Sequence, residues 1–110
     1  MASKAHNMNE RKVMAIRVDV RFLGIFQRLS GKKKLQIELD DQATVKDVIA
    51  KISEIFSADF RDVLVDSQLD DPRPNALILV GGKEISALDG LETEVKDSDE
   101  IVLVPMVHGG

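Results

Sequence analysis

The stretch Thr44-Val45-Lys46-Asp47-Val48-Ile49-Ala50-Lys51-Ile52-Ser53-Glu54-Ile55-Phe56 decides the fold that this sequence predicts. Its apolar residues recur at spacings of three and four, which is typical of one face of an amphipathic helix. Thr44 is a good N-cap residue, and Asp47 follows three residues later, as in a weak capping box. The sequence therefore predicts one main helix over Thr44–Phe56, whose apolar face must be covered by another layer.

Two alternating segments precede this helix. Residues 14–22 and 35–39 place apolar and polar side chains in strict alternation, as expected of strands that are buried on one face only. Between them, Leu23 to Lys34 contains Gly24 and Gly31 and ends in three lysines, so we expect a long hairpin loop there.

Further strands are expected after the helix. Residues 57–75 are irregular, with a short helical turn expected around Phe60 and a proline-containing turn over residues 70–75. A buried strand is expected at Ala76–Val80, a short edge strand near Ile85 and a last strand at Ile101–Val104. A hairpin, one helix and then more strands exclude a doubly wound α/β fold, which needs repeated βα units. We expect an α+β protein, a β-grasp with a mixed sheet of about five strands and one main helix packed across one face.

Composition limits the possible functions. The 110 residues suit one domain, and the absence of cysteine excludes a disulfide, a catalytic thiol and a thiolate metal site. Few aromatic residues, 4% of the chain, lead us to expect an aliphatic core. A net charge of −4 argues against direct nucleic-acid binding. No apolar run suggests a membrane span or a signal peptide, so we expect a cytoplasmic protein with no membrane contact. We also expect the protein to be a monomer.

The sequence ends in Gly109-Gly110, directly after the expected last strand and Pro105-Met106-Val107-His108. Residues without side chains can enter a narrow slot in another protein, although a frayed terminus is the alternative. We expect three segments: a flexible arm over residues 1–13, the domain over 14–106, and a flexible tail over 107–110.

Other candidate motifs are weak. His6 and His108 are the only histidines, and we expect neither to bind a metal. Lys32-Lys33-Lys34 is more typical of a solvated turn than of a nucleic-acid site, because no aromatic residues interleave with it. We identify no pair of nucleophile and base, so we expect no catalytic residue, no metal, no cofactor and no enzymatic activity.

The residues Asp97 to Gly110 resemble the C-terminus of MoaD-type sulfur carriers, in which an acidic turn, a strand, a proline and Gly-Gly follow one another. The His108-Gly109-Gly110 ending and the segments 73–80 and 88–91 resemble the ubiquitin-related modifier family. The resemblance covers about residues 14–110. The arm over residues 1–12 and the long loop after the helix depart from a minimal carrier and favour the modifier branch.

This resemblance implies that an E1-like enzyme adenylates the carboxylate of Gly110, with ATP bound by that partner. Sulfur transfer to Gly110 would then give a thiocarboxylate for tRNA thiolation or molybdopterin synthesis, and attack by a lysine would give an isopeptide-linked tag. Gly109 and His108 would be read by the partner, and Met106 and Val107 would form its docking surface, unless both simply complete the core.

Two alternatives remain. The protein could serve only as the small subunit of molybdopterin synthase, or it could be a β-grasp interaction module that is never transferred. The partners implied by the resemblance are the E1-like enzyme and either a sulfur-acceptor enzyme or lysines of target proteins.

Overall fold

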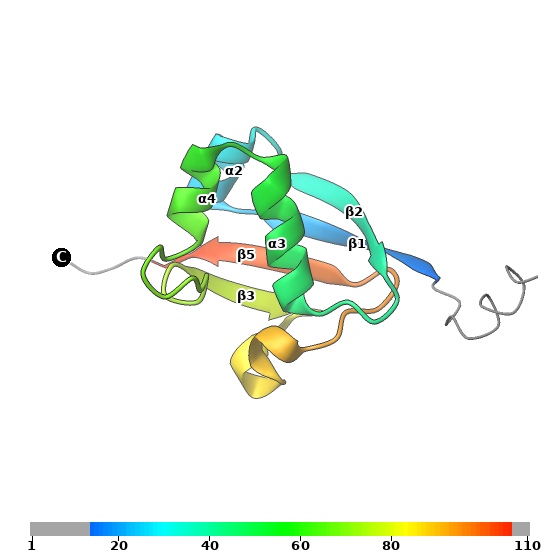
Figure 1. Cartoon of the computed structure of the whole chain (residues 1–110). Coiled ribbons are helices and arrows are strands. Elements are labelled where there is room, and N and C mark those ends of the chain that lie inside the picture. The colour runs from blue at the N-terminus through cyan, green and yellow to red at the C-terminus, as the bar shows by residue number, and fades with distance from the viewer. Residues whose placement is uncertain (1–13, 107–110) are drawn as a thin grey trace, which may run out of the picture.

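The main helix, α3 (Val45–Ile55), lies across one face of a five-stranded mixed sheet (Figure 1). This computed structural model describes residues 14–106. The strands are β1 (Ala15–Phe22), β2 (Lys34–Asp40), β3 (Ala76–Val80), β4 (Lys83–Glu84) and β5 (Glu100–Pro105). Their order in the sheet is β2-β1-β5-β3-β4, with β5 in the centre, parallel to β1 and antiparallel to β3. The predicted β-grasp is therefore confirmed.

The hairpin of β1 and β2 has the register that the alternating patterns require. Ile16 faces Leu39, and Val18 faces Ile37, so the apolar side chains of both strands share the face that carries α3. The side chain of Val18 is fully buried. The polar side chains between them lie on the other face of the hairpin.

The start of α3 is held by the predicted capping box. The backbone N–H of Thr44 donates to Oδ2 of Asp47 over 2.9 Å, which satisfies a donor that precedes the helical hydrogen bonds. The first buried residue of the helix is Val45, and Val48, Ile49 and Ile52 continue the buried stripe. The predicted helix is thus confirmed, and its described bounds lie one residue inside the predicted range at each end.

The prediction of a long loop between β1 and β2 is wrong in one respect, because residues Gly24–Ser30 form a short helix, α2. The helix ends at Gly31, whose φ of 73° is open to glycine and whose N–H donates to the carbonyl oxygen of Gln27. Phe26 is fully buried. Burial of this ring against the rest of the core stabilises a helix too short to form by itself.

A second short helix, α4 (Ala58–Leu64), confirms the helical turn expected around Phe60. Oγ of Ser57 accepts the N–H of Phe60 and caps this helix. After β3, the short edge strand β4 ends at Glu84, and Ile85 starts the 3-10 helix η1 (Ile85–Ala87) instead of extending the strand. A further 3-10 helix, η2 (Gly90–Glu92), leads toward β5.

The expectation of a purely aliphatic core needs correction, because all four phenylalanines gather in one cluster. The ring centroids of Phe56 and Phe60 lie 4.8 Å apart, and those of Phe22 and Phe60 lie 5.7 Å apart. Phe26 completes the cluster, 6.0 Å from Phe60. The aromatic share is small, but the fold concentrates it where α2 and α4 meet the ends of β1 and α3. The rest of the core is aliphatic, as expected.

Within residues 14–106, no helix is both long enough and apolar enough to cross a membrane.

Candidate functional site

The candidate site begins where β5 leaves the middle of the sheet. β5 pairs with β1 up to Leu103, opposite Phe22, and with β3 up to Pro105, opposite Ala76. Met106 follows directly, so the strand that leads toward residues 107–110 is paired on both sides up to Leu103 and with β3 alone up to its last residue, Pro105. The predicted site residues Val107, His108, Gly109 and Gly110 lie outside the described part of the chain.

Met106 is fixed through its backbone while much of its side chain stays in contact with solvent. Its N–H donates to the carbonyl oxygen of Asn75 over 3.0 Å, and 45% of the residue is exposed. Asn75 is itself held, because its N–H donates to the carbonyl oxygen of Pro72. The turn of residues 72–75, which the prolines predicted, therefore positions the first residue after β5.

This turn is anchored by an ion pair between Asp71 and Arg73. Nη2 of Arg73 lies 2.6 Å from Oδ2 of Asp71, and its Nε lies 3.0 Å from Oδ1, which is a bidentate arrangement. The hydrogen bonds from Arg73 lower the pKa of Asp71 and raise the pKa of Arg73. The Asp71 side chain is 19% exposed, so the pair is partly shielded from solvent.

Gly24 closes the other side of the strand exit. A Cβ atom at residue 24 would lie 2.8 Å from Cγ of Pro105, closer than real Cβ contacts come. The N–H of Leu23 also donates to the carbonyl oxygen of Leu103. The start of α2 therefore packs directly on the end of β5.

Two surface hollows meet at Met106. One, of about 160 Å³, is lined by Ile25, Phe26, Val63, Asn75, Pro105 and Met106. The other, of about 240 Å³, lies toward β4 and is lined by residues that include Ile78, Ile85 and Arg73. A partly exposed methionine between two mainly apolar hollows can take up an apolar side chain of a partner protein.

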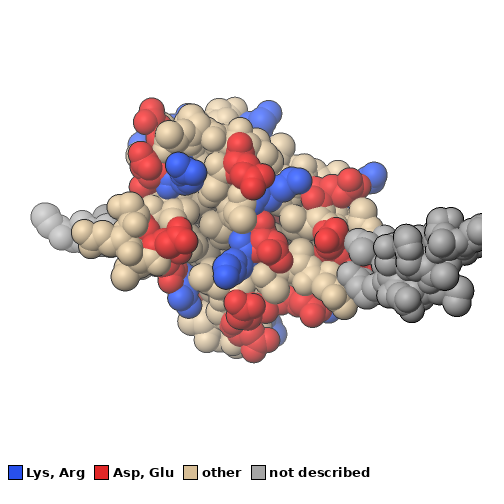
Figure 2. All heavy atoms as spheres, in the orientation of Figure 1, with Lys and Arg blue, Asp and Glu red and all other residues tan. Residues whose placement is uncertain are grey.

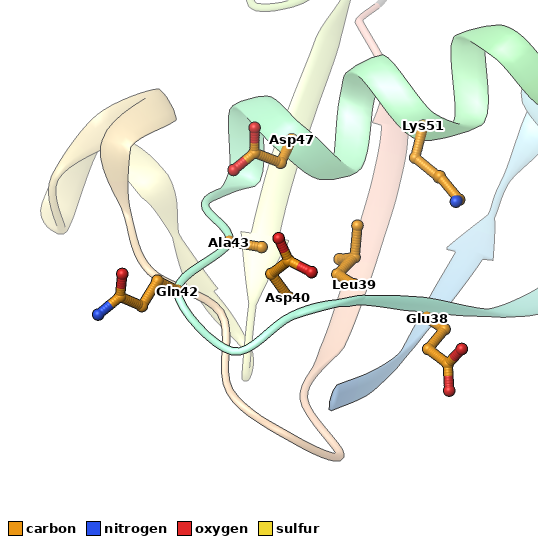
Figure 3. A pocket seen from close by; sticks show the side chains of 7 residues that line it. All are labelled: Glu38, Leu39, Asp40, Gln42, Ala43, Asp47 and Lys51. Carbon is orange, nitrogen blue, oxygen red and sulfur yellow. The ribbon is translucent and has the colours of Figure 1, made fainter. Parts of the chain in front are cut away.

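Charges of both signs are interspersed on the face that carries the helices (Figure 2). A further hollow, of about 410 Å³, lies between α3 and the end of β2, where Asp40, Asp47 and Lys51 line it (Figure 3). Asp47 is already engaged in the helix cap. Within residues 14–106, no group of three or more His, Cys, Asp or Glu side chains is placed to hold a metal ion.

Sequence reasoning expected Met106 where the chain leaves the last strand, and it lies there, but the residues that position it were missed. Gly24, Asn75 and the hollow formed with α2 and α4 come from segments far apart in the sequence. The local signals were Gly24, two residues after the end of β1, and the prolines that predicted the turn of residues 72–75.

The model of the family described as "ThiS family" matches residues 20–110, which is most of the chain and includes Gly109 and Gly110. The chain belongs to the ThiS family.

The names of two similar proteins agree with the resemblance to sulfur carriers and modifiers that the sequence shows. A putative sulfur carrier protein of Archaeoglobus fulgidus is 38% identical over 76 residues, 67% of this chain and 83% of that protein. Small archaeal modifier protein 3 of Haloferax volcanii is 29% identical over 93 residues, 84% of this chain and 98% of that protein.

The solution structure of small archaeal modifier protein 1 from Methanosarcina acetivorans matches with a TM-score of 0.76 at 26% identity. The match covers 88% of this chain and 99% of that one. The predicted membership among ubiquitin-like sulfur carriers and modifiers is therefore confirmed. The similar proteins are named as a sulfur carrier and as modifiers.

Proposed function

We propose that this ThiS-family protein is a sulfur carrier and protein modifier whose C-terminal carboxylate, on Gly110, is adenylated by an E1-like enzyme. One observation carries the proposal: the family match extends through Gly110, and β5 leads from the centre of the sheet directly toward that residue. We propose residues 14–106 as the carrier domain, residues 107–110 as the segment that enters the enzyme, and residues 1–13 as a separate arm.

The first step would activate the carboxylate. An oxygen of Gly110 attacks the α-phosphorus of ATP and pyrophosphate leaves, so that an acyl-adenylate forms. The carboxylate alone is a poor electrophile because its negative charge is delocalised and its leaving group would be oxide. The acyl-adenylate has AMP as a leaving group instead, and the partner enzyme supplies the ATP site.

The second step would decide between the two roles. Attack by a sulfide sulfur on the carbonyl carbon of Gly110 displaces AMP and leaves a thiocarboxylate, which can donate its sulfur. Attack by a lysine amine of a target protein displaces AMP, loses a proton and leaves an isopeptide bond. The relatives' names, a sulfur carrier and an archaeal modifier, support one role each.

The domain would contribute a rigid support and a docking surface to this chemistry. Residues 107–110 can span at most about 14 Å when extended, so the enzyme must approach the end of β5 closely. Met106, and Val107 beyond the described residues, are the proposed docking residues. The enzyme would recognise Gly109 and His108 inside the channel that leads to its ATP site. A larger side chain at residue 109 would prevent the end of the chain from passing through this channel.

The experiment uses the purified full chain with its E1-like enzyme, ATP and radiolabelled pyrophosphate. We expect exchange of label into ATP with the full chain and none after deletion of Gly109 and Gly110. A matched control adds one alanine after Gly110, which keeps the domain intact but moves the carboxylate. Exchange that continues with the truncated chain would refute the proposal.

Intact-mass spectrometry then separates the fates of the activated chain. Adding a sulfide source should give a species heavier by about 16 Da, because one carboxylate oxygen is replaced by sulfur. Adding a cell extract from the source organism and ATP should give chain-sized adducts on lysines. A pure interaction module would give neither product.

A further inference from the structure

One edge of the sheet is formed by the seven-residue strand β2. Among residues 14–106, the ladder partner of β2 is β1 alone, so the outer side of β2 is open (Figure 1). The opposite edge ends in the two-residue β4, which is followed at once by η1. A long open edge presents N–H and C=O groups that can pair with another strand.

The hydrogen bonds to β1 show which groups of β2 point outward. The N–H of Phe22 donates to the carbonyl oxygen of Lys33 over 2.9 Å, so these two residues form a hydrogen-bonded pair. Such pairs alternate along an antiparallel ladder, so Leu35, Ile37 and Leu39 also direct their N–H and C=O groups toward β1. Those of Lys34, Gln36 and Glu38 therefore point toward the open edge.

The side chains along this edge change sign from one end to the other. Three lysines, Lys32 to Lys34, stand at its start, and Glu38 and Asp40 stand at its end. Figure 3 shows Leu39 pointing toward α3 and Glu38 pointing away from it, onto the other face. When a strand of this pattern pairs antiparallel with a copy of itself, the basic end of each copy meets the acidic end of the other.

We propose that a second copy of this chain occupies the open edge, with the two β2 strands antiparallel about Gln36. In this register, Lys34 of each copy lies opposite Glu38 of the other, and Lys32 lies opposite Asp40. Only the outward-pointing groups of Lys34, Gln36 and Glu38 are used for the new ladder. The two five-stranded sheets join into a single sheet of ten strands. Two residues of the lysine triplet then face carboxylates of the other copy, and the chain forms a dimer instead of the monomer that we expected from the sequence.

Ion pairs within the chain compete only weakly with this arrangement. Nζ of Lys34 lies 3.8 Å from Oδ2 of Asp19, and Nε of Arg17 lies 4.0 Å from Oε2 of Glu38. Both distances are long and most of the side chains involved are more than half exposed, so these pairs are easily exchanged. One pair of short strands buries little area, so the dimer should form only at high protein concentration.

The dimer would leave both candidate functional sites free. Neighbouring strands are about 4.8 Å apart, so the two β5 strands would lie about 24 Å apart, five spacings across the joined sheet. The two-fold axis reverses one copy relative to the other, and the ends of β5 therefore point to opposite sides. Each Met106 could then meet a separate partner molecule.

The test is sedimentation equilibrium of the full chain from about 5 µM to about 1 mM at low salt, where mass action favours association. We expect the average mass to rise from 12.2 kDa toward twice that value. Lys34→Glu and Glu38→Lys should each remain monomeric, because each sets like charges opposite one another. Thermal melting of each variant provides the control for folding.

A mixture of the two variants gives the decisive result. In the proposed register, the residue substituted at position 34 of one variant faces the residue substituted at position 38 of the other. The equimolar mixture should therefore dimerise although neither variant does alone. Gln36→Pro removes an outward N–H and should abolish the dimer while the hairpin with β1 persists.

Three results would overturn the proposal. The first is a wild-type chain that stays monomeric over the whole range. The second is a dimer that is unaffected by Gln36→Pro. The third is a mixture of Lys34→Glu and Glu38→Lys that remains monomeric. In that last case, a mixture of Lys34→Glu and Asp40→Lys would be tested next. If this mixture dimerises, residue 34 of one copy lies opposite residue 40 of the other, so the two-fold axis passes through Ile37 and the register proposed here is wrong.

Discussion

Gly24 and Pro105 are in close contact: a Cβ atom at residue 24 would lie 2.8 Å from Cγ of Pro105 and 3.5 Å from Cδ. Gly24 also has a φ of +54°, a conformation that residues with a side chain rarely adopt. Two separate reasons therefore require glycine at the start of α2. Because Pro105 is the last residue of β5, this contact connects the α2 helix to the exit of the strand that leads toward Gly110.

We predict that Gly24→Ala lowers the free energy of unfolding by about 2–5 kcal/mol. The left-handed conformation costs a non-glycine residue about 1–2 kcal/mol, and overpacking against Pro105 adds about 1–3 kcal/mol. Urea denaturation followed by far-UV circular dichroism measures the loss.

Gly31→Ala is the matched control for that prediction. Gly31 has a φ of +73°, but a Cβ atom there would meet nothing within 4 Å. We expect a loss of about 1–2 kcal/mol, from conformation alone. Equal losses for the two variants would show that the contact with Pro105 relaxes without cost.

A second prediction concerns the face of α3 that covers the sheet. Ile52 is fully buried at the centre of the helix, whereas its neighbour Lys51 is exposed. Ile52→Ala should lower the free energy of unfolding by about 2–5 kcal/mol, because it leaves a cavity in the core. Lys51→Ala should change it by no more than about 0.5 kcal/mol. Equal urea midpoints for the two variants would contradict the packing described here.

How much of this could be predicted from the sequence depends on where each signal lies. The face of α3 and the alternation of β1 were predicted because each pattern is complete within one segment. The helix α2 was missed because its seven residues begin with one glycine, Gly24, and are followed by another, Gly31, and both indicate turns when read alone. What stabilises it is Phe26, whose partner Phe60 is more than thirty positions away.

The candidate site shows the same limit. The position of Met106 at the exit of β5 could be predicted because it follows the last apolar strand directly, whereas its docking role stays a prediction. The carbonyl oxygen of Asn75 that accepts its N–H, and the side chains of Ile25 and Val63 that line the hollow beside it, are brought there only by the tertiary fold. No local pattern in the sequence indicates these contacts.

A third prediction concerns the titration of Asp71. Hydrogen bonds from Arg73 hold the pKa of this carboxyl group below its ordinary value of 3.8. A group whose pKa is lower in the folded state stabilises the fold above its unfolded pKa. This contribution is lost as the pH falls from that value through the folded pKa. NMR titration of the Asp71 carboxyl carbon should therefore give a midpoint below 3.8.

Arg73→Met tests the cause of that shift. It removes the guanidinium but keeps an unbranched side chain, and the midpoint of Asp71 should then move upward. Arg17→Met is the control, since Arg17 is an exposed cation in a different ion pair, with Glu38. An Asp71 midpoint that is the same in wild type and Arg73→Met would rule out Arg73 as the cause.

The last prediction concerns the docking surface. Met106 is 45% exposed and borders two hollows, so Met106→Asp should leave the melting temperature nearly unchanged. An apolar residue at the centre of an interface often contributes more than 1 kcal/mol, so affinity for the E1-like enzyme should fall by about tenfold or more. Isothermal titration calorimetry of the full chain with the enzyme measures this loss.

Met14→Asp is the matched control, because it makes the same change at a methionine that is 57% exposed. Met14 directly precedes β1, and β1 runs parallel to β5, so Met14 lies at the end of the sheet away from Met106. We expect its affinity for the enzyme to equal that of the wild type. If both variants bind equally well, or if Met106→Asp melts many degrees lower while the folded fraction binds normally, Met106 completes the core and the enzyme docks elsewhere.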